Sequence, residues 1–236
     1  MKNPKPSGFT LLELLVVIGL ISLLSALLAA GLGGGGRAAA LEAGQATMAS
    51  LITAARTKAP ATGRKARLLV NADPASAERY LRRIVLQLAR QPGASPADWD
   101  TVVDVDLPDG IYIAPPVLTQ PAGLVTTPSE WTRTSNPGNE LASDLFQGQS
   151  VAVLLAGEGA AQTWMGIAFT PNGTLAGVGS GQPPKGYLVV APGIRRPPGS
   201  YSTGESPVQL VQPNSVRGLL LSAYGVPALL NDRRAF

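Results

Sequence analysis

The apolar residues of the chain are concentrated first near its N-terminus. From Leu14 to Leu32 no residue is charged, and only Ser22 and Ser25 carry hydroxyl groups. At a rise of ~1.5 Å per residue, a helix of this length approaches the ~30 Å hydrocarbon core of a bilayer. We therefore expect a transmembrane helix over about residues 9–32.

A second helical pattern follows this uncharged stretch. Over residues 38–59, apolar side chains recur at helical spacing and form one stripe, made of Leu41, Met48, Leu51, Ile52 and Ala55. Polar residues are assigned mostly outside the stripe, among them Glu42, Gln45, Arg56 and Lys58. This half of the helix should therefore be amphipathic and pack on a globular head.

The whole N-terminal helix is expected over residues 9–60. Pro60 and Gly63 disfavour helix, so we expect helical structure from about Thr10 to about Lys58.

Glycines interrupt the sequence between the two halves of this helix. Each glycine costs a helix about 1 kcal/mol relative to alanine. The run consists of Gly31, Gly33, Gly34, Gly35 and Gly36. We expect residues 31–36 to bend or melt, and to act either as a hinge within the helix or as a flexible linker between anchor and head.

Beyond residue 60 the pattern changes to short apolar runs separated by Pro, Gly and Asn, which is typical of an antiparallel sheet. Residues 164–169 and 174–178 should form a hairpin, because Asn172-Gly173 supplies the positive φ of a tight turn. A helix followed by a sheet indicates an α+β fold, with residues 61–236 as a β-rich head. Further strands are expected at residues 67–70, 102–105, 110–113, 151–155, 187–190, 208–211 and 219–224.

Two parts of the head follow no single pattern. Residues 74–90 fit one amphipathic helix, or a short helix opened by Asp73-Pro74 and followed by a strand around Ile84-Val85. Residues 114–149 are rich in Pro, Thr, Ser, Asn and Gly, which predicts a long surface loop.

Composition and charge limit the chemistry and set the topology. The chain has no His and no Cys, so it has no imidazole base, thiol nucleophile, thiolate metal site or disulfide. The formal net charge is +4, and two of the positive charges belong to Lys2 and Lys5. These lysines precede the apolar stretch, so the positive-inside rule leaves the N-terminus cytoplasmic and residues 37–236 on the other side of the membrane.

The most specific motif lies at the start of the chain. The segment Gly8-Phe9-Thr10-Leu11-Leu12-Glu13-Leu14 follows basic residues and leads into the apolar stretch. It closely resembles the cleavage and methylation motif of type IV prepilins. The resemblance implies that residues 1–8 are a leader peptide and that a prepilin peptidase cleaves between Gly8 and Phe9. It also implies N-methylation of the new Phe9 amine.

A carboxylate near the start of an apolar helix is costly, by about 2.5–3.5 kcal/mol near the bilayer centre and less toward an interface. Glu13 lies four residues after Phe9, which is about one helical turn. Its carboxylate could neutralise the terminal amine of a neighbouring subunit, and the resemblance to pilins implies that it guides subunit entry into a filament. The alternative is an interfacial carboxylate that snorkels without a partner.

Several head segments are also similar to one group of minor pseudopilins, the general secretion pathway protein H and fimbrial protein T types. These segments are residues 54–56, 107–111, 167–173 and 221–225.

Two sets of charged residues are candidate binding sites. Asp98, Asp100, Asp104, Asp106 and Asp109 could furnish oxygen ligands for Ca²⁺, but alternation along a solvent-facing edge strand explains them better, and we expect no metal and no cofactor. Two arginine pairs with aromatic residues not far away could contact DNA, although solvated loop charge is the favoured interpretation. These pairs are Arg195-Arg196 and Arg233-Arg234.

The sequence thus predicts a structural subunit of a type IV pilus-like filament, most specifically a minor pseudopilin of type II secretion, without catalytic activity. Its implied partners are other pilin subunits, a prepilin peptidase and an inner-membrane assembly platform. We expect a single-pass inner-membrane protein with a periplasmic head, assembled into a periplasmic or extracellular filament. The alternatives are a DNA-binding minor pilin of a DNA-uptake pilus and a membrane-anchored periplasmic domain of another function, such as an enzyme.

Overall fold

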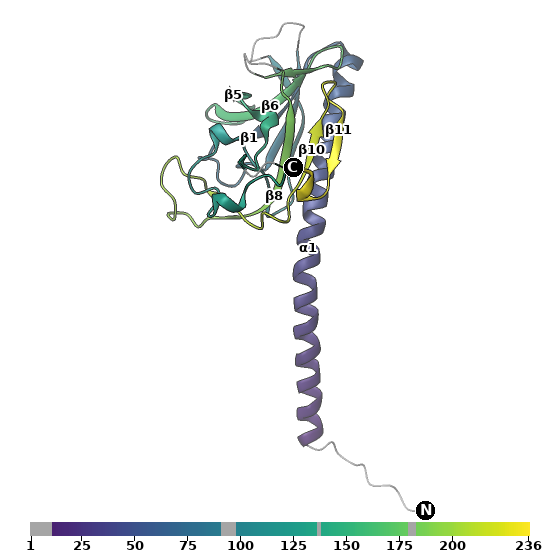
Figure 1. Ribbon diagram of the computed structural model, residues 1–236, viewed down its shortest axis with the longest axis vertical. Helices are drawn as coiled ribbons and strands as arrows, with labels where there is room; N and C mark the ends of the chain where they lie inside the picture. The colour runs from purple at the N-terminus through teal and green to yellow at the C-terminus, as the bar shows by residue number, and fades with distance from the viewer. Residues whose placement is uncertain (1–10, 91–97, 136–137, 179–182) are drawn as a thin grey trace, which may run out of the picture. The chain divides into compact units, whose positions relative to one another are not determined.

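The computed structural model describes residues 11–90, 98–135, 138–178 and 183–236, except for the side chains of residues 12, 13, 23 and 25–35. The chain divides between Ala39 and Ala40 into two compact units. Helix α1 (Leu11–Thr62) contributes to both. The first unit contains the N-terminal part of this helix, and the second contains its C-terminal part and all the strands (Figure 1).

Helix α1 ends later than expected. Pro60 lies inside the helix, in its last turn, and therefore does not stop it. Gly63 follows with φ of 64°, and the amide of Arg64 donates to the carbonyl of Ala59. A residue in the left-handed region just after the last turn is the usual way for a helix to end, so Gly63 rather than Pro60 ends the helix.

The part of α1 in the second unit has the predicted apolar stripe. All five residues assigned to it are buried, and Ala59 extends it. Gln45 was wrongly assigned outside the stripe: it is only 2% exposed and lies in the same helical row as Leu41 and Met48. A polar side chain is not counted in an apolar pattern, so the sequence did not place Gln45 in the stripe. Gln45 can be buried because its amide donates to backbone carbonyls of the head rather than to water.

Sheet A is antiparallel and has six strands. Its order is β3-β2-β1-β6-β5, and β7 pairs with β6 on the same side as β5. The strands are β1 (Ala66–Asn71), β2 (Arg83–Ala89), β3 (Trp99–Asp106), β5 (Ser150–Val153), β6 (Gln162–Phe169) and β7 (Leu175–Gly177).

Sheet B is also antiparallel and has five strands in the order β11-β10-β8-β4, with β9 paired to the end of β8. In Figure 1 the yellow hairpin of β10 and β11 lies beside α1 within the second unit. The strands are β4 (Ile111–Ile113), β8 (Gly186–Arg195), β9 (Val208–Leu210), β10 (Arg217–Leu221) and β11 (Pro227–Leu230).

One main core joins the helix to both sheets. It receives alternate residues of β1 and β2, together with Met48 and Ile52 of α1 and Val190 and Leu219 of sheet B. The opposite face of sheet A carries a second, smaller apolar cluster of Leu69, Val85, Val153, Leu155 and Trp164. Strands β1 and β2 are therefore buried along both faces.

The hairpin at residues 171–173 is confirmed. Gly173 has φ of 76°, and its amide donates to the carbonyl of Thr170 at 2.8 Å. The strands β6 and β7 that it connects pair Phe169 with Leu175.

The open question at residues 74–90 resolves as turns followed by a strand. No α-helix forms between Asp73 and Arg82, within a stretch that the structure describes fully. The Asp73 side chain accepts from the amide of Ala75, which holds a turn rather than a helix start. Leu81 has φ of 58°, a left-handed conformation that interrupts helix, and β2 begins at Arg83.

The expectation of a surface loop at residues 114–149 is wrong in one respect. The described residues of this segment form three short 3₁₀ turns, η1 (Val117–Thr119), η2 (Pro128–Glu130) and η3 (Asp144–Phe146), and one isolated bridge between Thr132 and Glu140. It nevertheless contributes side chains to the main core, namely Leu124, Trp131, Leu141, Leu145 and Phe146. These apolar residues are widely spaced within a mostly polar segment, so they form no pattern that predicts burial.

Strand β11 was missed because Pro227 and Ala228 do not suggest a strand. Proline is tolerated at the first residue of an edge strand, where its missing amide is not needed for pairing. The last turn, η4 (Arg233–Ala235), brings Phe236 into the core beneath Gly218, and its ring centroid lies 5.6 Å from that of Tyr187.

Candidate subunit interface

Gly8 and Phe9 lie outside the described residues, and so does the side chain of Glu13. The backbone of residue 13 is helical, three residues into the assigned helix α1.

In the first unit, the described side chains between Leu11 and Leu24 are apolar on all sides of the helix, apart from Ser22. Nine large apolar side chains between Leu11 and Leu24 are exposed. Residues 14–18 are consecutive and 46% to 65% exposed, and five successive helical positions cover a full turn. Burying each such side chain contributes roughly 1.5–3 kcal/mol, so covering all nine is favourable by more than about 10 kcal/mol. A helix of this kind needs an apolar environment on every side.

Within the described residues, no helix qualifies as long and apolar enough to cross a membrane. The expected span of about residues 9–32 includes Phe9, Thr10 and the side chains of residues 12, 13, 23 and 25–32, all of which lie outside that description.

The glycine run is helical. Residues 31–36 belong to α1 without a break, so the expected melting is not observed. Starting a helix is unfavourable, but extending an existing helix adds one backbone hydrogen bond for each residue. The helical segments on both sides of the glycine run therefore allow it to be helical, although it would not form a helix in isolation.

The second half of α1 is fixed to sheet B at close range. A Cβ on Gly44 would lie 2.9 Å from the Ile111 side chain, so glycine is needed for this approach. The Gln45 amide donates to the carbonyls of Gly218, at 2.8 Å, and Leu230, at 3.0 Å. Arg56 Nε donates to the carbonyl of Tyr224 at 3.0 Å. These bonds tie the helix to the hairpin of β10 and β11 at two levels.

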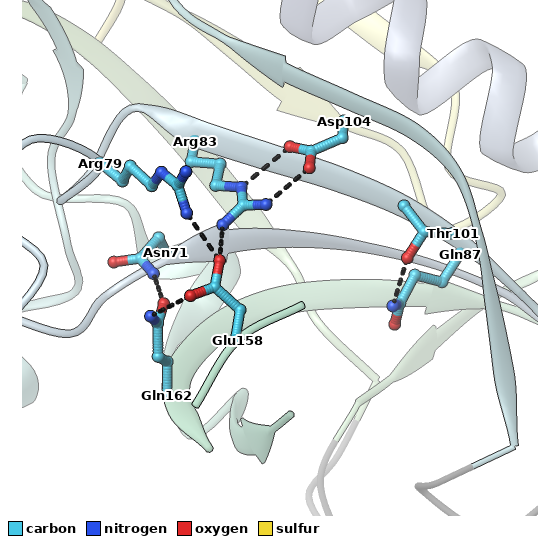
Figure 2. A network of polar contacts seen from close by, with 8 residues as sticks. All are labelled: Asn71, Arg79, Arg83, Gln87, Thr101, Asp104, Glu158 and Gln162. Atoms are coloured by element: carbon cyan, nitrogen blue, oxygen red, sulfur yellow. Dashed lines mark hydrogen bonds and ion pairs between the residues drawn. The ribbon is translucent and has the colours of Figure 1, made fainter. Parts of the chain in front are cut away.

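A polar network lies on the face of sheet A that carries the smaller apolar cluster (Figure 2). Arg83 donates to both carboxylate oxygens of Asp104, at 2.9 and 2.6 Å, and to Glu158 at 2.6 Å. Arg79 donates to the same Glu158 oxygen at 2.6 Å. The other Glu158 oxygen accepts from Gln162, whose side chain accepts in turn from Asn71. The network holds the segment between β5 and β6 against the sheet.

The charges of this network shift one another's pKa values. The hydrogen bonds from Arg83 hold the pKa values of Asp104 and Glu158 below their ordinary range. The hydrogen bond to Asp104 raises the pKa of Arg83. These shifts come from paired charges that stabilise the fold, and sequence reasoning missed the network because Glu158 lies in a glycine-rich turn.

The same sheet face holds a second buried arginine. Arg67 Nε donates to Gln87 at 2.8 Å, and its guanidinium lies 4.1 Å from the ring centroid of Trp99. Burial lowers the pKa of Arg67 to about 10.

The aspartates weighed as Ca²⁺ ligands are largely engaged by arginines. Asp100 pairs with Arg64 and Arg90, and Asp104 pairs with Arg83. Asp109 pairs with Arg82 at 2.7 Å. The described residues contain no group of three or more acidic side chains placed to hold a metal ion.

The arginines considered as DNA contacts form hydrogen bonds and ion pairs within the head. Arg233 donates to the Asn214 side chain and to the carbonyls of Glu130 and Thr132. Arg196 pairs with Glu205 and lies 5.5 Å from the Tyr201 ring centroid. Arg195 makes a 3.4 Å ion pair with Glu78, and the exposed Arg234 contributes its backbone amide to the Asp232 cap.

The head contains hollows without an evident catalytic arrangement among the described residues. One cavity of about 620 Å³ is lined by Asp144, Lys185 and mostly Gly, Pro and Gln residues. Asp144 is already hydrogen-bonded to Arg133. A second cavity of about 300 Å³ is lined by prolines, Tyr80, Phe146 and Met165.

Comparison with known proteins identifies the N-terminal segment and leaves the head unassigned. Residues 3–29 match the family described as the prokaryotic N-terminal methylation motif. No curated protein and no solved structure is significantly similar to the chain, so the resemblance of the head to the H and T types of minor pseudopilin is not shown. The motif indicates a structural subunit that assembles with other pilin subunits, rather than an enzyme. The chain therefore carries the N-terminal signature of type IV pilins and pseudopilins.

Proposed function

We propose that the chain is a structural subunit of a type IV pilus-like filament and, more specifically, a minor pseudopilin of a type II secretion system. The observation that carries the proposal is the set of nine exposed apolar side chains of α1 between Leu11 and Leu24, within the segment that matches the methylation motif. A filament core or a bilayer would cover such a helix on all sides, whereas a soluble enzyme would have no use for it.

The proposed maturation begins in the membrane. Residues 9–32 anchor the chain in the inner membrane, with the leader of residues 1–8 in the cytoplasm and the head of residues 61–236 in the periplasm. A prepilin peptidase removes the leader after Gly8, and the new Phe9 amine is methylated. The lysines of the leader and the absence of charge from Leu14 to Leu32 support this orientation.

Assembly is proposed to depend on Glu13. In a bilayer, a lone carboxylate and a lone terminal amine are both costly, and pairing them removes much of that cost. Glu13 of an incoming subunit therefore pairs with the Phe9 amine of its neighbour as the inner-membrane assembly platform lifts the subunit. Packing of the apolar helices against one another then holds the filament.

The glycine run is proposed to act as a hinge during this transfer. Residues 31–36 are helical in the isolated chain, but their low helix propensity makes local opening less costly there than elsewhere in α1. A subunit could thus change the direction of its anchor without unfolding its head.

The pairing can be tested with Glu13→Gln, which keeps the size of the side chain and removes its charge. Sheared or pelleted filaments should contain at least tenfold less of this variant than of the parent, at equal amounts in the membrane. Glu42→Gln is the matched control, because Glu42 is 70% exposed and lies 3.7 Å from Arg217. Equal incorporation of Glu13→Gln and the parent chain would contradict the proposed role.

A further inference from the structure

The hairpin of β10 and β11 carries several exposed apolar residues. Nine large apolar side chains are exposed among the described residues of the head, and four of them belong to this hairpin. We call these four the hairpin patch: Leu220, Tyr224, Val226 and Leu229. No charged residue occurs from Gly218 to Asn231. Such a concentration of exposed apolar surface usually marks a place where another molecule binds.

The strand register places these side chains on both faces of the hairpin. Leu220 is paired with Ala228, and the amide of Ser222 donates to the carbonyl of Val226, so Leu220 and Val226 share the sheet face that points away from α1. Leu229 is paired with Leu219, a core residue on the helix-facing side, yet Leu229 is 56% exposed because β11 is the edge strand. The patch therefore wraps around the open edge of sheet B.

Backbone groups of this edge are also open. The Val189 amide donates to Ser143, and its carbonyl accepts from Ala114, so Val189 bonds away from β10. Its partner Gly218 must then direct its own amide and carbonyl toward β11. By the same alternation, Leu229 directs its amide and carbonyl outward, beyond the described part of the sheet.

The edge strands β3 and β11 differ in charge. Strand β3 is an edge of sheet A and carries Asp100, Asp104 and Asp106. Charged residues on an edge strand discourage pairing with another chain. Strand β11, with the sequence Pro-Ala-Leu-Leu, carries no charged residue.

The hairpin is bound to the part of α1 that lies in the second unit. Gln45 binds the base of the hairpin through Gly218 and Leu230, and Arg56 binds its tip at Tyr224. A neighbour that packs along the part of α1 from Ala40 to Thr62 would therefore meet the hairpin as well, because both belong to the second unit. Because the patch is apolar and uncharged, an apolar surface of another protein matches it better than nucleic acid does.

We propose that the hairpin patch is the docking surface for the head of a neighbouring pilin-like subunit in the filament. This inference rests on the proposed function, since it takes the filament as given. It adds a second contact, between heads, to the contact between the apolar helices.

The absence of native cysteine makes the surface directly testable. Single cysteines are introduced into the full chain in its native membranes as Tyr224→Cys, Leu118→Cys and Val17→Cys, and each is labelled with a benzophenone maleimide and irradiated. Leu118 is the matched control, because it is 83% exposed in η1, away from the hairpin in the sequence. Position 17 tests the contact between the apolar helices of neighbouring subunits, which is part of the proposed function. Adducts are identified by mass spectrometry of the partner.

We expect positions 17 and 224 to form adducts with subunits that carry an N-terminal methylation motif. The yield of these adducts should be at least fivefold higher at position 224 than at position 118. If position 17 gives such adducts and position 224 does not exceed 118, the docking surface is wrong and the proposed function stands. If neither position gives them, both are wrong. An adduct of position 224 with a protein that lacks the motif would also overturn the inference.

Discussion

The attachment of α1 to sheet B should depend on one buried glutamine. Gln45 is 2% exposed and donates two hydrogen bonds to backbone carbonyls of the β10–β11 hairpin, and Gln45→Ala removes both. The same chemical change can be made at an exposed position three residues earlier in the helix, by comparing Glu42→Gln with Glu42→Ala. Each change from glutamine to alanine gains the same few tenths of a kcal/mol in helix propensity, so that contribution cancels. The ion pair of Glu42 with Arg217 is absent from both control variants and cancels as well.

The magnitude follows from the two bonds. A neutral hydrogen bond contributes about 0.5–1.5 kcal/mol net. Replacing glutamine by alanine should therefore lower the free energy of unfolding by about 1–3 kcal/mol more at position 45 than at position 42. The volume lost at a buried position acts in the same direction.

Chemical denaturation of the full chain in detergent, followed by tryptophan fluorescence, measures this difference. Trp131 and Trp164 are buried in the same unit as Gln45 and report its unfolding. Equal slopes with denaturant concentration would show that all the variants unfold in the same way. A difference between the two positions below about 0.5 kcal/mol would refute the argument, since the two bonds together would then contribute less than the lower limit for a single bond.

Two further predictions concern sheet A. In the folded chain the pKa values of Asp104 and Glu158 are lower than their ordinary values of 3.8 and 4.5. The two carboxylates therefore stabilise the fold at a pH above the ordinary pKa values, and this stabilisation is lost as the pH falls through the lowered pKa values of the folded chain. Acid titration of unfolding should show this loss, and Glu158→Gln should weaken the pH dependence; an unchanged profile would contradict the role of the network. Gly166→Ala should destabilise the fold by about 1–3 kcal/mol or more, because its Cβ would lie 2.2 Å from the Leu68 carbonyl oxygen, whereas Gly159→Ala meets nothing within 4 Å. Equal melting temperatures of these two variants would contradict the packing of β1 on β6.

The elements with strong periodic patterns were predictable from the sequence. The stripe of α1 was found because five apolar residues repeat at helical spacing, and the turn at Gly173 was found because few other residues adopt its positive φ. The α+β class followed from the same two patterns. The N-terminal signature needed no structure, since its residues are contiguous in the sequence.

Other features depend on contacts between distant residues. The sequence of β2 could not be separated from a helix, because burial of both faces removes the alternation that marks a strand. Gln45 looked like a surface residue because its partners, Gly218 and Leu230, lie far along the chain. The hairpin patch was not recognisable either, since an apolar run does not reveal whether the fold will cover it.

The central claim is that the chain is processed and assembled as a pilin-like subunit. The most direct test is the intact mass and N-terminal sequence of the protein recovered from membranes of cells with and without a prepilin peptidase. We predict a peptidase-dependent start at Phe9 that carries one added methyl group. An intact leader in both strains, or cleavage near Ala30, would contradict the account.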